Sequence, residues 1–491
     1  MKRLSAATLA DLPDDIRRPS YDRQAVRTGV VHLGIGAFHR AHQAMLFEAA
    51  LEAGDTRWGV CGVSLRSAAV RDQLAPQDGL YSLVERDTAD ERVRIIGAVQ
   101  SVLVAPEDPE AVIAALASPD VHLVTLTITE KGYKLSGGTL DFSDPEVAHD
   151  LSAPKAPKSA VGFLVAALAR RHAVGLPPFT ALSCDNLPHN GRLLRDAVLA
   201  FAERIDPALA PWIAAEGAFP QSMVDRIVPA TTEADIAALA TRLGCEDRAM
   251  VKTEPFFQWV IQDRFCGPRP DFAGLGAQLT SDIAPWEEAK LRLLNGAHSA
   301  IAYLGGLAGI EYVHEFVARE GSRHFVEALW DESATTLTPP AALDLATYRA
   351  ALMARFADPA LMHRTRQIAM DGSQKIPQRL LAPISHRLDH GQEIEALSLA
   401  VAGWMRWQGG LTDAGRACDV EDPLAAATRE AIASANSPLE IVSNLLRINS
   451  IFSERLAADD IFRQNLERDY NALAEWGATA TMSRISPDRN E

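Results

Sequence analysis

Cysteines are few in this sequence, and none of them lies in a pattern that would bind zinc. Five are spread over 491 residues, and no two form a C-x-x-C pair. An odd, dispersed set of thiols is typical of a reducing compartment and argues against a disulfide framework or a cysteine-based zinc centre. We therefore expect a cytoplasmic protein without a bound metal.

Long apolar runs and an excess of positive charge are also lacking. No uninterrupted apolar stretch approaches the roughly 20 residues that a membrane-spanning helix needs, and no apolar segment typical of a signal peptide follows the first residues. The formal net charge of −16 argues against a nucleic-acid partner, because phosphates require a basic face. An anionic substrate would need a locally cationic pocket.

What is present indicates a globular protein of two domains, because the chain is too long for one ordinary core. Strands alternate with helices in residues 1–284, which predicts an α/β, Rossmann-like domain with a mostly parallel sheet. Residues 285–491 carry long amphipathic segments, which predict a mainly α-helical domain. The segments expected as strands in the first domain are 28–33, 58–65, 80–84, 93–96, 121–128 and 179–184, and helices are expected at 39–53, 109–117, 159–171 and 193–204.

A glycine turn follows the first expected strand. Gly34 would allow a tight turn, and Gly36 would let the backbone approach a pyrophosphate at the start of the next helix. The third glycine of the usual G-x-G-x-x-G pattern is absent, because His39 stands there. The turn is thus compatible both with dinucleotide binding and with an ordinary connection between strand and helix.

The end of the second expected strand lacks the acidic residue that usually reads the ribose of NAD. Ser64, Leu65 and Arg66 occupy this region instead. Arg66 could meet a 2′-phosphate or could simply be solvated, so these residues leave the choice between NAD and NADP open. Three polar clusters follow where a parallel sheet would face its ligand, although each also suits a connecting turn. They are residues 127–133, 183–191 and 222–229.

One stretch of the second half combines basic, acidic and amide side chains. On a regular helix, Glu287, Lys290, Asn295 and His298 return to one side of residues 286–298. Leucines fill the positions between them, and apolar surroundings make it easier for a lysine to lose its proton. The stretch predicts a general base, although a core helix with a few solvated positions has the same pattern.

Together these motifs resemble the polyol-specific long-chain dehydrogenase family, which contains mannitol 2-dehydrogenases and fructuronate reductases. The resemblance covers nearly the whole chain. It rests on Gly34-x-Gly36-x-Phe38-His39-Arg40, Cys184-Asp185-Asn186, Met223 to Pro229, Glu254 to Ile261, Lys290-x5-Asn295-x2-His298, and Asp371 to Arg379.

The resemblance implies metal-independent hydride transfer between NAD(H) and a sugar-derived ketone or secondary alcohol. Lys290 matches the family's lysine base, and His298 its substrate-orienting histidine. Asn186 and Asn295 match two asparagines that bind the carbonyl, and Asp225 matches an aspartate on the cofactor side. The glycine-loop motif implies cofactor binding by Gly34, Gly36, Phe38, His39 and Arg40.

Within the family the sequence looks closer to fructuronate reductases. We expect reduction of D-fructuronate by NADH to D-mannonate, with Arg379 or Lys375 opposite the substrate carboxylate. The alternatives are a dehydrogenase of mannitol, arabinitol or a related polyol and, more remotely, a non-catalytic dinucleotide sensor. We expect a monomer or small homo-oligomer.

Glu287 precedes Lys290 by one helical turn, and we hypothesise that it relays the proton of the lysine to solvent. Other dehydrogenase chemistries fit less well. None of the seven tyrosines has a lysine four residues later, so the Tyr-x-x-x-Lys pair of short-chain dehydrogenases is absent.

Overall fold

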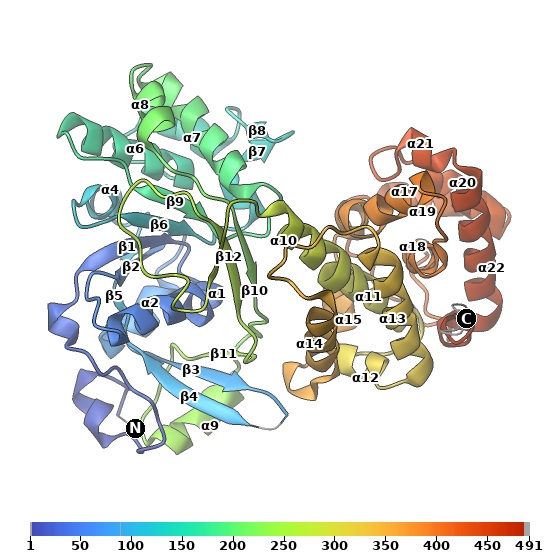
Figure 1. Cartoon of the computed structure of the whole chain (residues 1–491), viewed down its shortest axis with the longest axis horizontal. Helices are drawn as coiled ribbons and strands as arrows, with labels where there is room; N and C mark the ends of the chain where they lie inside the picture. The colour runs from blue at the N-terminus through green and yellow to red at the C-terminus, as the bar shows by residue number, and fades with distance from the viewer. Residues whose placement is uncertain (1, 89, 486–491) are drawn as a thin grey trace. The chain divides into compact units, whose positions relative to one another are not determined.

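The computed structural model describes residues 2–88 and 90–485, and these form two compact units (Figure 1). The first unit comprises Met1–Ile283 and the second Ala284–Glu491. Each unit has its own apolar core. The first is built around sheets, and the second is helical throughout its described part, as the sequence predicts.

A five-stranded parallel sheet forms the centre of the first unit. Its strand order is β5-β2-β1-β6-β9, so the sheet is doubly wound about β1. Almost every residue of the three central strands is buried, because helices cover both faces of such a sheet. The expected Rossmann-like architecture is confirmed. The strands are β1 (Thr28–Leu33), β2 (Gly59–Ser64), β5 (Val99–Val104), β6 (Leu123–Leu126) and β9 (Thr180–Ser183).

Two segments that the alternation assigned to the parallel sheet lie elsewhere. β3 (Tyr81–Arg86) and β4 (Glu91–Ile96) form an antiparallel hairpin, which β11 (Val251–Thr253) extends on its β3 side. The segment between the two strands is too short for a crossover helix, and a hairpin is the pairing that a short connection permits. A third small sheet joins β10 (Ser222–Asp225), β12 (Gln258–Gln262) and β13 (Gln278–Thr280).

The helix expected at residues 39–53 is two helices. α1 (Ala37–Ala41) ends at His42, whose φ of −121° and ψ of −84° are not helical, and α2 (Gln43–Glu52) follows. The other expected helices of this unit agree with the structure to within a few residues. They are α4 (Pro109–Ala117), α6 (Ala160–Ala173) and α7 (Asn190–Ile205).

In the second unit, three long helices pack together as the core: α11 (Gly296–Leu307), α18 (Glu395–Trp407) and α22 (Asp460–Met482). The expected regular helix over residues 286–298 is corrected by the structure. α10 (Ala284–Ala289) leads into a π-helical segment, η5 (Lys290–Asn295), before α11 begins. A second π segment, η7 (Pro377–Leu381), lies between α16 (Gly372–Ile376) and α17 (Ala382–Asp389).

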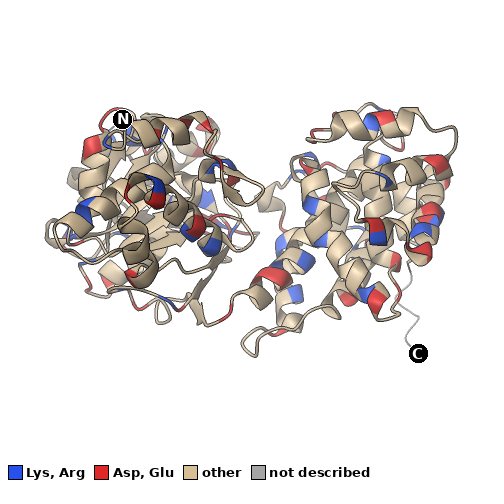
Figure 2. Ribbon diagram, turned by 90° about the horizontal axis from the view of Figure 1, so that it is seen from above, with Lys and Arg blue, Asp and Glu red and all other residues tan. Residues whose placement is uncertain are grey.

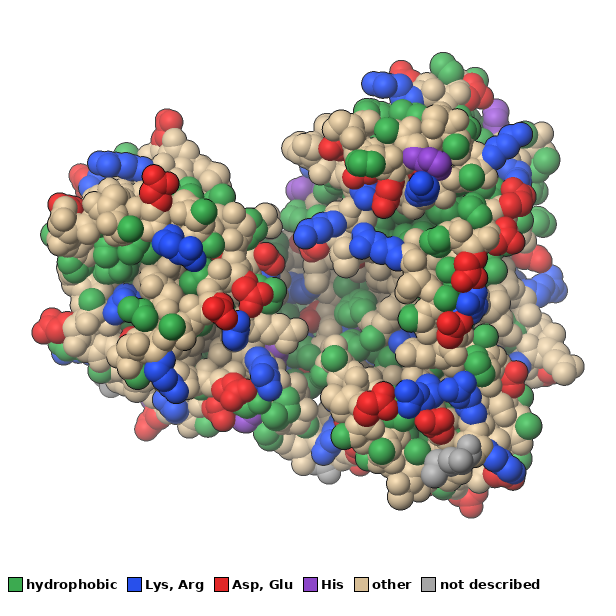
Figure 3. All heavy atoms as spheres, turned by 180° about the vertical axis from the view of Figure 1, so that it is seen from behind, with side chains coloured by type: hydrophobic (Ala, Val, Ile, Leu, Met, Phe, Trp, Pro, Cys, Tyr) green, Lys and Arg blue, Asp and Glu red, His purple; other side chains and the backbone are tan. Residues whose placement is uncertain are grey.

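Charged side chains of both signs are interspersed along the helices of each unit (Figure 2). On the face shown in Figure 3, hydrophobic side chains occur in small groups among polar and charged ones. In the described part of the chain, no helix is both long and apolar enough to cross a membrane.

Candidate active site

Gly34 is required by the turn at the end of β1. Its φ is +92°, and a Cβ there would lie 2.2 Å from the carbonyl oxygen of Thr127 on the neighbouring strand's loop. At Gly36 the reason differs, because a Cβ would meet only the Gly34 oxygen, at 3.8 Å. The surface above Gly36 is therefore open, and its backbone is accessible to a ligand, as a pyrophosphate-binding turn requires.

The residues after the glycine turn face the interior. His39 is fully buried and stacks on His32, with ring centroids 3.5 Å apart. The Arg40 guanidinium is buried and donates to the carbonyl oxygens of Gly36 and Ala249. Both side chains thus support the turn from below, and this geometry does not favour direct contact of either with a cofactor. Phe38 is partly buried and stacks on His42 at 5.1 Å.

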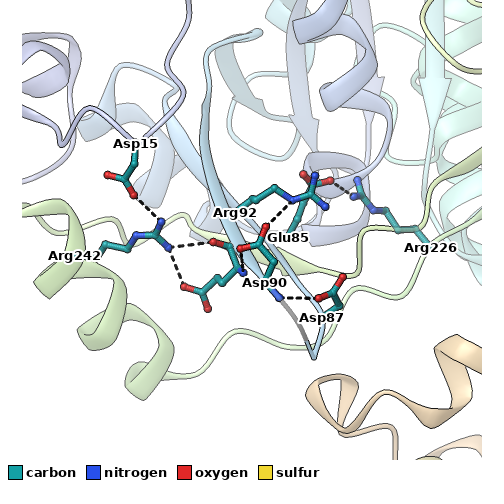
Figure 4. A network of polar contacts seen from close by, with 8 residues as sticks. Asp15, Glu85, Asp87, Asp90, Arg92, Arg226 and Arg242 are labelled. Carbon is teal, nitrogen blue, oxygen red and sulfur yellow. Dashed lines mark hydrogen bonds and ion pairs between the residues drawn. The ribbon is translucent and has the colours of Figure 1, made fainter.

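Asp225, the last residue of β10, is followed by a buried arginine that fixes its surroundings. The Arg226 guanidinium donates to the carbonyl oxygens of Ala41, at 2.6 Å, and Glu254, at 2.9 Å. It also pairs with the Glu85 carboxylate at 2.5 Å. Figure 4 shows this pair beside the exposed ion pairs of the β3–β4 hairpin. Arg226 therefore ties the end of β10 to α1, the helix that follows the glycine turn.

Asn186 lies just beyond the carboxyl end of β9, and its side chain is exposed. The parallel sheet explains this position, because ligands of such sheets bind outside the carboxyl ends of the strands. The first unit thus places Gly34, Asn186 and the loop after β6 at the same edge of the sheet, since β1, β6 and β9 are neighbours.

In the second unit, the two π segments pack against each other. Gly296, directly after η5, permits this approach, because a Cβ there would lie 3.2 Å from the carbonyl oxygen of Arg379 in η7. Widening a helix releases carbonyl groups that then need other donors. Trp330 Nε1 donates to the Leu293 oxygen at 2.8 Å, and Arg379 Nη1 approaches the Asn295 oxygen at 3.4 Å.

His298 is the centre of a cationic cluster in this unit. Burial lowers the pKa of its imidazole well below the usual range, so the ring is neutral at physiological pH. Its Nε2 is buried and has no hydrogen-bond partner among the described residues. The neighbours whose charges lower the pKa further are His363, Arg355, Arg379 and Lys290.

Two members of this cluster escaped sequence analysis. The His363 ring lies edge-on to His298, with centroids 5.0 Å apart, and burial lowers its pKa to about 4. Arg355 is buried on α14 (Leu345–Ala357). Neither lies in a glycine turn or at the end of an expected strand, so nothing local in the sequence distinguished them from core or surface residues.

The two candidate partners of a substrate carboxylate differ in their surroundings. Arg379 is half-buried and uses only Nη1, toward Asn295 and toward Ser299 Oγ at 3.2 Å. Its Nε and Nη2 have no hydrogen-bond partner in residues 2–88 and 90–485. Lys375 donates to the Met370 carbonyl at 2.5 Å. The geometry therefore favours Arg379, which also belongs to the cluster around His298.

Lys290 is buried at the start of η5, and Asn295, which is half-buried, ends that segment. Glu287 lies on α10, half-buried, one turn before the lysine. The adjacent Glu288 is paired with Arg292 at 3.3 Å. Because Glu287 is half-buried and precedes Lys290 by one turn, its role in proton relay stays a prediction.

Among the described residues, no group of three or more His, Cys, Asp or Glu side chains could hold a metal ion. The five cysteines are all free thiols. The candidate site is thus built from amide, imidazole, ammonium and guanidinium groups.

Two family models match the chain. The model of the mannitol dehydrogenase Rossmann domain matches residues 28–274, and that of the mannitol dehydrogenase C-terminal domain matches residues 282–474. Among curated proteins, the chain is 45% identical to the uncharacterized oxidoreductase YeiQ of Escherichia coli K12, over 95% of this chain and 96% of that protein.

D-mannonate oxidoreductase of the same organism is 42% identical to this chain, over 97% of this chain and all of that protein. Among solved structures, the ternary complex of Pseudomonas fluorescens mannitol 2-dehydrogenase with NAD and D-mannitol superposes with a TM-score of 0.86. That chain is 38% identical, with 98% of each chain covered.

Proposed function

Because the chain belongs to the mannitol dehydrogenase family, we propose that it is an NAD-dependent oxidoreductase that interconverts D-fructuronate and D-mannonate. The observation that carries the choice of a sugar acid is the cationic cluster around His298. A chain with a net charge of −16 collects Lys290, Arg355 and Arg379 near one buried imidazole. Such a cluster favours an anionic substrate.

Arg379 would bind the carboxylate of the substrate. A guanidinium presents parallel N–H donors that match the two oxygens of a carboxylate, and Nε and Nη2 of Arg379 are the donors left over by the protein. Burial lowers the pKa of Arg379 to about 10, so the group remains cationic at neutral pH. The 42% identity to a D-mannonate oxidoreductase supports the same substrate.

The N-terminal unit fits a dinucleotide. The tight turn at Gly34 and the open backbone at Gly36 would cradle the pyrophosphate, and Asp225, next to the buried Arg226, would lie on the cofactor side. NAD supplies the hydride chemistry when bound. The complex of mannitol 2-dehydrogenase with NAD supports this cofactor, whereas Arg66 after β2 makes NADP the alternative to test.

Three side chains would act on the substrate oxygen. Asn186 and Asn295 would stabilise its negative charge, and Lys290 would exchange its proton. In the reducing direction, the asparagine amides donate to the carbonyl oxygen as it becomes negative, and each such donor is worth about 3 kcal/mol of barrier. The Lys290 ammonium then gives its proton to this oxygen. In oxidation the neutral amine accepts the proton, and Glu287 would pass it to solvent.

A second candidate is reduction of D-fructose to D-mannitol. It is favoured by the solved mannitol 2-dehydrogenase complex, whose ligand carries hydroxyl groups only. Arg379 could donate to hydroxyls as well, so a comparison of the two substrates must decide between the candidates.

The test is NADH oxidation, followed by absorbance, with D-fructuronate and D-fructose in parallel and NADPH as a second cofactor. We expect kcat/KM for fructuronate to exceed that for fructose by more than about tenfold, which equals about 1.4 kcal/mol. Preference for fructose would assign the protein to the polyol branch. Binding of NADH without turnover of any sugar acid or polyol would instead indicate a dinucleotide sensor.

A further inference from the structure

Asn186 stands at the tip of a three-residue turn. The Leu187 N–H donates to the Asp185 carbonyl oxygen at 2.8 Å, so the backbone closes around Asn186. The same oxygen accepts from Asn190 Nδ2 at 3.0 Å, and Asn190 is completely buried. The backbone under Asn186 is therefore held from both sides, although its own side chain is exposed.

The side chain of Asp185 binds the loop that follows the adjacent strand β6. Its carboxylate accepts from the Ile128 N–H at 3.1 Å, the Thr129 N–H at 2.9 Å and the Tyr133 hydroxyl at 2.7 Å. Tyr133 is buried and also bonds to Ser183, the last residue of β9. One carboxylate thus joins the loops after two neighbouring strands.

Thr129 adopts a backbone conformation that is almost restricted to glycine. Its φ is +64° and its ψ is 164°, yet its side chain is β-branched. This conformation is what turns the Thr129 N–H toward Asp185. Strain of this kind persists where the surrounding structure fixes it, and it is concentrated at functional sites.

We propose that Asp185 is a positioning residue that, together with the strained Thr129, holds the amide of Asn186 ready for the substrate oxygen. The inference rests on the proposed function, in which Asn186 donates to that oxygen. A donor contributes to the transition state only if it is already in place, and a shift of about 1 Å can cost about 100-fold in rate. The hydrogen bonds of Asp185 to Ile128, Thr129 and Tyr133, which we call the brace, supply this placement from the protein interior.

The test is a double-mutant cycle with Asp185→Asn and Asn186→Ala. In Asp185→Asn, one acceptor oxygen becomes a donor that faces N–H groups. We expect kcat to fall about 30-fold, while the Kd for NADH, measured by fluorescence, changes less than threefold. If Asp185 acts through Asn186, the same change in the Asn186→Ala background lowers kcat by less than threefold.

Thr129→Gly separates positioning from stability. Glycine relieves the strain, so Tm is expected to stay or rise, while kcat falls severalfold because the loop is no longer forced against Asp185. Additive effects of Asp185→Asn and Asn186→Ala, or an unchanged kcat in Thr129→Gly, would overturn the inference.

The proposed function fails in a different way. If Asn186→Ala itself leaves kcat unchanged, then Asn186 does not bind the reacting oxygen. The proposed roles of Asn186 and of Asp185 would then both be wrong. If Asn186→Ala lowers kcat but its effect adds to that of Asp185→Asn, the proposed function stands. Only the positioning role of Asp185 is then rejected.

Discussion

In the N-terminal unit the proposed site residues lie at the carboxyl ends of strands, whereas in the C-terminal unit they lie on helices that π segments widen. Asn186 depends on hydrogen bonds between loops, chiefly those of Asp185. Lys290 and Asn295 depend on the register of η5 and on its contact with η7. Both kinds of local structure, strand ends and π segments, thus hold polar side chains in fixed positions.

The largest effect is expected for Lys290→Ala, which removes the acid–base group from the helical unit. General acid–base catalysis contributes about 100- to 10,000-fold, so kcat should fall by this amount with little change in the Kd for NADH. Lys155→Ala, at an exposed lysine, is the control. Retention of activity in Lys290→Ala would place the acid–base chemistry elsewhere.

Contact between the π segments can be broken by Gly296→Val. The new side chain meets the Arg379 carbonyl and must push η5 away from η7, so we expect kcat to fall about tenfold or more and Tm to fall by several degrees. Ala382→Val, at an exposed position of α17, serves as the control. Steady-state kinetics with wild-type values for Gly296→Val would show that the register of η5 is not critical.

The buried ion pair of the strand unit can be compared with an exposed one in the same view (Figure 4). Arg226→Lys keeps the charge but loses most contacts to Ala41, Glu85 and Glu254, so we expect about 2–3 kcal/mol less free energy of unfolding in urea. Arg242→Lys, whose pair with Asp15 is on the surface, should change the free energy of unfolding much less. Equal losses of unfolding free energy in the two variants would mean that Arg226 does not hold β10 and α1 together.

The sequence gives reasons to propose individual site residues, but it does not predict how they are arranged. The glycine turn, Asn186 and the Lys290 stretch carry local signals, because special backbone conformations and polar groups in apolar runs are visible in the chain itself. The π turn of η5 is invisible to a 3.6-residue pattern, since it depends on donors from distant residues such as Trp330. Arg355 and His363 join the site only through tertiary packing, and the β3–β4 hairpin depends on pairing rather than on composition.

The smallest effect concerns pH, and each unit offers one test group. Burial raises the pKa of Glu48, in the strand unit, and of Glu332, in the helical unit, to about 7, from 4.5. The folded state therefore keeps a proton that the unfolded state releases between these pH values, and stability falls as pH rises through this window. We expect Glu48→Gln and Glu332→Gln to flatten this fall in unfolding experiments from pH 5 to pH 8. A fall as steep as that of the wild type would contradict the burial of these protons.

The sugar-acid assignment is tested most directly by measuring kcat/KM of the wild type and of Arg379→Ala with D-fructuronate and with D-fructose. We expect Arg379→Ala to lose about 100-fold with fructuronate, because a charge-assisted bidentate pair disappears, and less than about fivefold with fructose. Lys375→Ala, whose ammonium binds the Met370 carbonyl, should not discriminate between the two substrates. Equal losses of Arg379→Ala on both substrates would contradict a carboxylate-reading site.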